Sequence, residues 1–503
     1  MLINLPSYRW FRPRQAPPGL WNVQKRKPDN FAFGKLCFHA QTSANWTNAV
    51  NLVLSEVGHT HPHHPAAGLT DSVIPFKRSP SMQRRQFLQT SGLGALAAAV
   101  PQTSADSASP PKRLAVVTTV WRNRSHAWHM AERFLHGYPI GGRWHRPPFK
   151  IVSAYIDQFP EGELGRSRAQ EFGFPIVSSI DKALRIGGNQ LNVDAVLIIG
   201  EHGDYDINQF GQKKYPRYEF FKAVTDVFRK DGRAVPVFND KHLSWRWDWA
   251  KEMVAISEEL DFGFAAGSSL PVTWRMPSVD MPLNAPVEEM MCLAMGGIDS
   301  YDFHALEVIQ CMAERRRGGE TGVESVQGLR GDSVWQAMES GSWSAGGWDP
   351  TLFAACLNRC QTLRQPGNFS HRYPTPQQIR EWVQDPLVYR IAYRDGTKAT
   401  MLLMNGLVSD FTFSARITGQ ELPLSTLFYL PPTPNVTYSA ELMARAEQTF
   451  LTGTSPNPIE RTLLTSGLVE AGCRSIGTGQ KTLKTPHLDV EYKPRKESLF
   501  ARS

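Results

Sequence analysis

The sequence predicts an α/β protein. An N-terminal Rossmann-like, doubly wound parallel sheet is followed by an α+β domain with an open, mainly antiparallel sheet. Short β-branched apolar runs recur between residues 113 and 238, and segments with apolar side chains at three- and four-residue spacing lie between them. Strands that alternate with helices indicate a parallel sheet. Beyond residue 288, alternating strand patterns separated by turn signals such as Asp395-Gly396 indicate antiparallel pairing.

The elements of the first domain follow in a regular order. Strands are expected at residues 113–120, 149–156, 176–177, 193–199 and 234–238. Helices are expected at residues 127–135, 166–172, 181–184 and 218–229. A helix over 245–260 and a strand over 262–267 come next along the chain. We place the boundary of the Rossmann-like domain at residues 113–245.

The second domain, residues 246–490, alternates between strand and helix patterns and precedes a tail at 491–503. Its strands are expected at residues 288–294, 323–329, 387–393, 399–404 and 407–417. Its helices are expected at residues 303–315, 352–364, 376–384 and 440–451. So few helices cannot cover both faces of the sheet, and exposed apolar sheet is usually buried by a partner. We therefore expect a homo-oligomer that associates through this sheet.

The first 112 residues indicate export. Residues 1–81 have no sustained periodicity and read as a disordered or mis-assigned extension, which makes Met82 the expected initiator. Residues 82–112 have the layout of a twin-arginine signal and linker, with Arg84-Arg85 before a short apolar run of small residues. That run is too short to span a bilayer, so we expect no integral membrane segment. Translation from Met82 predicts a periplasmic or exported protein; otherwise the chain is cytoplasmic.

Composition excludes several classes of function. The net charge of +8 is mild and no basic run is interleaved with aromatic residues, so nucleic-acid binding is not expected. The six cysteines lack a Cys-x-x-Cys pair and define no disulfide framework. His202, Asp204 and Asp206 alternate in one loop, but a single short loop rarely closes a metal site, and no metal is predicted.

The loop after the first strand is the expected phosphate site of a dinucleotide, because ligands of doubly wound sheets bind at the carboxyl ends of the strands. This loop, residues 118–126, has no glycine, and Trp121-Arg122 would crowd a pyrophosphate. Arginine side chains could bind phosphate instead, and Asp157 at the end of the second strand could accept from a ribose hydroxyl. The expected cofactor is NAD or NADP, and the residues expected near it are Thr118, Thr119, Ser125, His126, Asp157, Gly200, Glu201 and His202.

Several segments resemble a known family in their order along the chain. The family's second helix, third strand and acidic turn resemble residues 165–175 and 181–184. Its lysine motif resembles residues 236–243, and its Gly-Gly…Asp…His segment resembles residues 296–307. Its closing helix resembles residues 458–464. Over roughly residues 113–490 the chain thus resembles the glucose–fructose oxidoreductase/inositol dehydrogenase (Gfo/Idh/MocA) family. His242 stands where the family has proline, and Ser300 stands where it has an aspartate.

The resemblance implies hydride transfer between a carbinol carbon and a nicotinamide. Lys241 would stabilise the developing charge, His304 would act as acid or base, and Asp299 or Asp302 would orient the imidazole. The structural alternative for His304 is a helix-start residue buried between the domains.

The first functional hypothesis is therefore an NAD(P)-dependent oxidoreductase acting on a sugar derivative or polyol. The alternatives are a non-catalytic carbohydrate-binding relative without a cofactor site, and an NAD-dependent glycosidase of the same family. A Trp121 that takes the pyrophosphate space would weaken the first and third hypotheses together.

Overall fold

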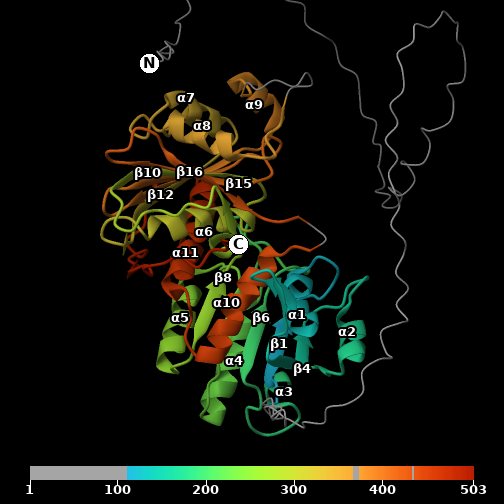
Figure 1. Cartoon of the computed structure of the whole chain (residues 1–503). Helices are drawn as coiled ribbons and strands as arrows, with labels where there is room; N and C mark the ends of the chain where they lie inside the picture. Colours follow the sequence, from blue (N-terminus) through green and yellow to red (C-terminus); the bar gives the residue numbers. More distant parts are fainter. Residues whose placement is uncertain (1–109, 366–372, 433–434, 503) are drawn as a thin grey trace, which may run out of the picture. The chain divides into compact units, whose positions relative to one another are not determined.

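A six-stranded parallel sheet forms the N-terminal lobe (Figure 1). Its strands, in the spatial order β5-β4-β1-β6-β7-β8, are Ile176–Val177, Phe149–Ile156, Lys112–Thr118, Ala195–Ile199, Val237–Asp240 and Phe264–Gly267. All neighbouring pairs are parallel. The order reverses beside β1, and in such sheets this reversal is where ligands bind. The predicted doubly wound sheet is confirmed.

The computed structural model describes residues 110–365, 373–432 and 435–502, which belong to one compact unit of the chain. The predicted export signal and the extension before it lie outside the described residues. No helix in the described part of the chain is long and apolar enough to cross a membrane.

Five helices accompany the parallel sheet. They are α1 (His126–His136), α2 (Gly165–Phe172), α3 (Ile180–Arg185), α4 (Arg217–Asp231) and α5 (Trp247–Glu259). A small hairpin, β2 (Tyr138–Ile140) and β3 (Arg143–His145), follows α1. Since α5 and β8 complete this sheet, the predicted boundary at residue 245 is too early. The apolar run of β8 is a sixth parallel strand rather than the start of the second domain.

The C-terminal lobe is built on an eight-stranded sheet in the order β17-β12-β13-β14-β10-β15-β16-β9. These strands are Leu483–Lys484, Val323–Arg330, Leu387–Tyr393, Lys398–Leu403, Val287–Ala294, Phe411–Ile417, Leu424–Tyr429 and Trp274–Met276. Only β10 and β14 pair in parallel, so the predicted, mainly antiparallel sheet is confirmed. A short 3-10 turn, Leu270–Val272, leads into this lobe.

Helices cover both faces of this sheet (Figure 1). On the face toward the N-terminal lobe lie α6 (Tyr301–Ala313) and α11 (Ile459–Gly477); on the other lie α7 (Asp332–Ser340), α8 (Pro350–Arg359) and α9 (Pro376–Trp382). Both faces of strand β10 are therefore buried. Met290 and Cys292 pack in the core on the side of α6 and α11, while Met291 and Leu293 pack in the core on the side of α8. The premise of an uncovered sheet face, on which we predicted an oligomer, is therefore wrong.

The end of the chain returns to the N-terminal lobe. Helix α10 (Tyr438–Thr452) places Met443 and Phe450 in the core shared by β1 and α1. Helix α11 contributes Leu464 and Leu468 to the core that joins the two lobes. Residues 491–502 are not a free tail, since β18 (Glu491–Tyr492) pairs with β11 (Glu320–Thr321) and Ala501 is buried.

Candidate functional site

A cavity of about 190 Å³ lies where the carboxyl ends of the parallel strands meet α6 and α10. Four histidines line it: His126 and His129 from α1, His202 from the loop after β6, and His304 from α6. We call this cavity the histidine pocket. Its position is the one at which doubly wound sheets bind ligands, and its polar lining differs from the core beneath it.

Four residues that line the histidine pocket have buried polar atoms without partners. Among the described residues, Nδ1 of His129, Nε2 of His202, Nδ1 of His304 and Oδ1 of Asp240 are buried and have no hydrogen-bond partner. An unsatisfied buried polar group costs about 1–3 kcal/mol, and most native proteins keep few of them. Four such atoms around one cavity indicate a site for a ligand that offers several hydrogen bonds.

His126 is held by a carboxylate. Its Nδ1 lies 2.6 Å from Oδ2 of Asp240, the last residue of β7. The centre of the His126 ring is 5.2 Å from that of His202 and 6.0 Å from that of His129. A carboxylate on one nitrogen fixes the orientation of an imidazole and leaves the other nitrogen for a ligand. Such a pair can act as a general base if a proton lies within hydrogen-bond reach.

The pocket histidines His129, His202 and His304 are neutral at pH 7. Burial lowers the pKa of His129 to about 3, with a further contribution from His126. Burial likewise lowers the pKa of His202 to about 4. The pKa of His304 also falls well below its usual value because of burial and the charge of Lys241. A neutral imidazole carries one donor and one acceptor, so these rings suit a ligand with hydroxyl groups better than an anion.

A buried ion-pair network stands beside the pocket. Glu201 accepts from Arg217 and lies 3.2 Å from Nζ of Lys241, which is only 2% exposed. Burial alone would raise the pKa of Glu201, but Lys241 and Arg217 together hold it well below its usual value. The Lys241 ammonium is also 3.4 Å from the carbonyl oxygen of Ser300. Lys241, the lysine predicted to stabilise charge, is therefore ion-paired with the buried carboxylate of Glu201.

Lys241 and His304 are neighbours of the same aromatic ring. Nζ of Lys241 lies 5.9 Å from the centre of the Tyr301 ring, and the His304 ring centre lies 5.7 Å from it. The two residues that resemble a family catalytic pair are thus brought to one place. His304 lines the pocket directly, whereas Lys241 does not line it and is near it only through Tyr301.

The predicted role of Asp299 or Asp302 as the partner of His304 is wrong. Asp302 accepts from the backbone N–H groups of Asp299, Ser300 and Phe303 at the start of α6, and from the hydroxyl of Tyr389. Asp299 accepts from the backbone N–H of Lys213. Within the described chain neither carboxylate reaches His304, whose Nδ1 has no partner. Asp302 instead satisfies the free N–H groups of a helix start.

The predicted phosphate-side residues bond to the protein itself. The hydroxyl of Thr118 donates to the carbonyl of Ile199, and that of Thr119 donates to the carbonyl of Glu201. Ser125 caps α1 by accepting from the backbone N–H of Trp128. At Gly200 a Cβ would lie 2.6 Å from the side chain of Arg217, so this glycine serves close packing. His126 and His202, by contrast, face the histidine pocket.

Asp157, the residue expected to bind a ribose, is also hydrogen-bonded to the protein itself. Asp157 follows β4, where a dinucleotide-binding sheet presents an acid to ribose. Here its two carboxylate oxygens accept from the hydroxyls of Tyr155 and Tyr205, at 2.9 and 2.6 Å.

A bridge between loops crosses the end of β1. Gln158, after β4, and Asp204, after β6, exchange two hydrogen bonds of 3.0 and 2.9 Å, and Gln158 also donates its backbone N–H to Thr119. Since β4 and β6 flank β1 in the sheet, the bridge lies across the path that a dinucleotide takes over that strand.

Trp121 anchors the turn after β1 in the core. It stands in the turn where a glycine would let a pyrophosphate come close, and it is 0% exposed. Its indole N–H donates to Glu132 and its ring stacks near Phe174, with ring centres 6.1 Å apart. Together with the bridge and the engaged Asp157, this turn does not fit an extended dinucleotide.

Sequence reasoning missed His129 and Asp240. His126 directly precedes the helix predicted at residues 127–135, and His129 follows three residues later, a spacing that places both on one face if the helix begins one residue earlier. Asp240 directly precedes Lys241 at the end of a predicted strand, so strand-end logic could also have found it. In the described residues no group of three or more His, Cys, Asp or Glu side chains is placed to hold a metal ion.

The strand order and the position of the site define a protein of the Rossmann class with a C-terminal α+β lobe. No family model matches the chain, and no curated protein matches its sequence. Among solved structures, GenD2 from gentamicin A biosynthesis in complex with NAD is 13% identical, with a TM-score of 0.46 over 74% of this chain and 96% of that chain.

Inositol dehydrogenases are also among the similar solved structures. The myo-inositol dehydrogenase of Corynebacterium glutamicum is 13% identical, with a TM-score of 0.43 over 74% of this chain and 98% of that one. The Lactobacillus casei enzyme, in complex with NAD(H) and myo-inositol, is 11% identical, with a TM-score of 0.44 over 74% and 96%. These are proteins of the kind that the sequence motifs resemble.

Proposed function

We propose that this chain binds a small polyhydroxylated molecule, a sugar derivative or polyol, in the histidine pocket and does so without a bound dinucleotide. The observation that carries the proposal is the set of four buried, unpartnered polar atoms on one cavity. A hydroxyl group can donate and accept at once, and so can pair with neutral imidazoles and with the carboxylate of Asp240. This is the second of the functions considered from the sequence.

The size of the pocket agrees with such a ligand. A cavity of about 190 Å³ lies below the roughly 300–1,000 Å³ of typical small-molecule sites. That is the scale of a single sugar ring rather than of a dinucleotide. Tyr301, Phe411 and Tyr438 add apolar ring faces against which the C–H groups of a sugar could pack. The two NAD-dependent hypotheses are disfavoured because the crevice over β1 is bridged by Gln158 and Asp204.

The test uses the double variant His129→Leu/His304→Leu. Removing unsatisfied buried nitrogens is expected to leave the free energy of unfolding unchanged or higher, while binding of the polyol is lost. Saturation-transfer NMR with myo-inositol, glucose and the corresponding sugar acids measures binding, and urea denaturation measures stability. His136→Leu on the same helix is the matched control, because His136 is exposed and lies outside the pocket.

Two results would contradict this function. One is a purified protein that releases one equivalent of NAD or NADP on denaturation, as detected by mass spectrometry. The other is a His129→Leu/His304→Leu variant that binds every one of these probes as the wild type does. A variant that loses stability along with binding would indicate that the histidines serve packing instead.

We further propose export through the twin-arginine pathway, with the mature chain beginning between Ala99 and Ser109. The support is the sequence Arg84-Arg85-Gln-Phe-Leu88 before a short run of small apolar residues. Changing both arginines to lysine is expected to leave precursor in the cytoplasm. N-terminal sequencing of native protein that begins at Met1 would overturn this proposal.

A further inference from the structure

A groove of about 680 Å³ shares no lining residue with the histidine pocket. We infer that this groove is a second ligand site and that it binds a neutral oligosaccharide. The inference goes beyond the proposed function, because it concerns different residues and a larger ligand. We call this site the α11 groove.

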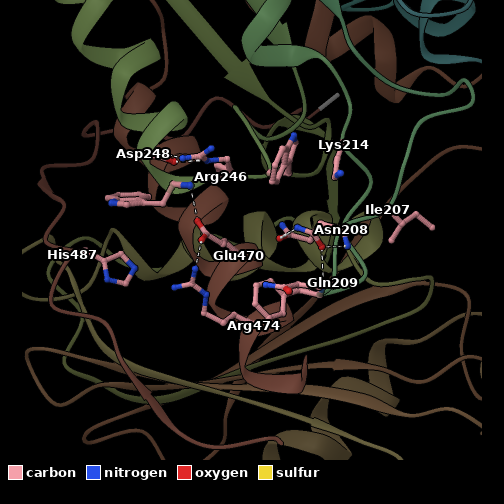
Figure 2. Close-up of a pocket in the computed structure, with 13 residues that line it drawn as sticks. Ile207, Asn208, Gln209, Lys214, Arg246, Asp248, Glu470, Arg474 and His487 are labelled. Carbon is pink, nitrogen blue, oxygen red and sulfur yellow. Dashed lines mark hydrogen bonds and ion pairs between the residues drawn. The ribbon is translucent and has the colours of Figure 1, made fainter. Parts of the chain in front are cut away.

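Three parts of the chain, together with His487, build the α11 groove. The loop after β6 supplies residues 207–210, 212 and 214, the turn before α5 supplies residues 245–248, and α11 supplies Glu470 and Arg474. Figure 2 shows Glu470 and Arg474 in the middle, with His487 on one side and Asn208 and Gln209 on the other. A floor made of one regular helix gives the site a rigid base.

One face of α11 seats two aromatic rings. Gly467, Glu470, Arg474 and Gly477 are spaced by three, four and three residues, which places them on one side of the helix. A Cβ at Gly467 would lie 2.8 Å from the ring of Trp247.

The second ring is seated in the same way. A Cβ at Gly477 would lie 2.7 Å from the ring of Phe210. The two glycines are ten residues apart, or about 15 Å at 1.5 Å per residue. Trp247 and Phe210 therefore pack against points on α11 that are about 15 Å apart, a span of several sugar units.

Compensated charges lie between the two rings. Glu470 and Arg474 form an ion pair of 3.4 Å, and Glu470 also accepts from the backbone N–H of Trp247. At the rim, Arg246 is paired with Asp248. These four charges have their counter-charges in place, and the exposed Lys214 is the further lysine or arginine of the lining. The paired charges favour a neutral ligand whose hydroxyls can bond to carboxylate and guanidinium groups together.

The groove also holds an unused donor. In the described structure the indole N–H of Trp245 is buried and has no acceptor, although Trp245 lines the groove. Sugars offer apolar C–H faces for aromatic rings and hydroxyl edges for such donors. A peptide is less suitable, because peptide recognition commonly adds a strand to a sheet edge or fills an apolar groove, and the lining here comes from two loop segments, α11 and His487. Aromatic ends with polar groups between them are the pattern that an oligosaccharide requires.

The probes are cellohexaose, mannohexaose, maltohexaose, xylohexaose and laminarihexaose, titrated into the whole protein by calorimetry at millimolar concentration. We expect at least one hexaose to bind, and its disaccharide to bind at least tenfold more weakly because it cannot reach both rings. Trp247→Ala and Trp245→Ala are each expected to weaken that hexaose by about tenfold or more. Glu470→Gln, which keeps the shape of the side chain, is expected to weaken it as well.

Two control variants test whether the hexaose binds in the α11 groove. Trp144→Ala removes a tryptophan that is 60% exposed and lies outside the groove, and it should leave binding unchanged. His304→Leu should also leave hexaose binding unchanged, because His304 lines the histidine pocket and not the α11 groove. This variant therefore tests the two proposed sites separately. Absence of binding by all five hexaoses, unaltered affinity in Trp247→Ala and Glu470→Gln, or displacement of the bound hexaose by peptides from a casein digest would overturn the inference.

Discussion

Replacing Trp121 by alanine tests whether the turn after β1 is locked. The side chain is 0% exposed, packs near Phe174 and donates to Glu132. A buried tryptophan removes about 150–250 Å² from water, which is worth about 4–6 kcal/mol at roughly 25 cal/mol per Å². Measured Trp→Ala losses in protein cores are about 3–5 kcal/mol. We therefore expect Trp121→Ala to lower the free energy of unfolding by about 4 kcal/mol.

Urea denaturation followed by tryptophan fluorescence and circular dichroism measures this loss. With a slope of about 3 kcal/mol per molar urea, the unfolding midpoint should fall by more than about 1 M. Millimolar NAD or NADH should leave the wild-type midpoint unchanged, because a ligand raises stability only if it binds the native state. A turn that opens to admit a dinucleotide would give a loss below about 1 kcal/mol and a rise of the midpoint with NAD. Either result would refute the locked turn.

Three further outcomes are expected. Glu201→Gln should lower the free energy of unfolding by about 3–5 kcal/mol in urea titrations, since it leaves Lys241 and Arg217 buried without a counter-charge. Adding Lys241→Met should recover part of this loss. Full stability of the Glu201→Gln variant would contradict the prediction. NMR of the histidine Cε1–H groups should find two rings neutral from pH 8 to pH 5, because burial lowers the pKa of His129 to about 3 and that of His202 to about 4. Both pKa values lie below the value near 6.5 of an unfolded histidine, so the stability that these rings contribute is complete above pH 6.5. It is lost as the pH falls through about 4 and then about 3. Titration midpoints near 6.5 for all histidine rings would exclude neutral, buried rings. Gly472→Ala should cost about 1–3 kcal/mol through overpacking, because its Cβ would lie 2.3 Å from the Tyr389 ring, whereas Gly297→Ala, which meets open space, should change the unfolding midpoint little.

The parallel sheet was predictable because its central strands are buried on both faces and therefore read as continuous apolar runs. All five residues of β6 are buried, and the predicted run contains them. Helix α11 was foreseen only at its start, through the resemblance of residues 458–464. It is buried on several sides, with Leu463, Leu464, Leu468 and Val469 all in the core, so it lacks the one-sided apolar stripe by which helices are recognised.

The candidate site was partly predictable for a related reason. Strand-end logic located His126 and His202, since both follow parallel strands. The bridge joins the side chain of Gln158 to the backbone of Asp204, 46 residues away, and no local pattern reports such a contact. The role of Asp302 was misread because the same carboxylate can orient an imidazole or cap a helix, and the sequence does not distinguish the two.

The return of α10 and α11 to the N-terminal lobe has a consequence for how the protein is made. The core around β1 and α1 is incomplete until Met443 and Phe450 arrive, and the junction of the lobes is incomplete until Leu464 and Leu468 arrive. A ribosome that adds about 5–20 residues per second therefore leaves the first lobe with an exposed apolar surface for many seconds after its own sheet has been synthesised. Nascent chains that lack α11 should accordingly depend on chaperones, and the emergence of α10 and α11 should be the step that permits the first lobe to close.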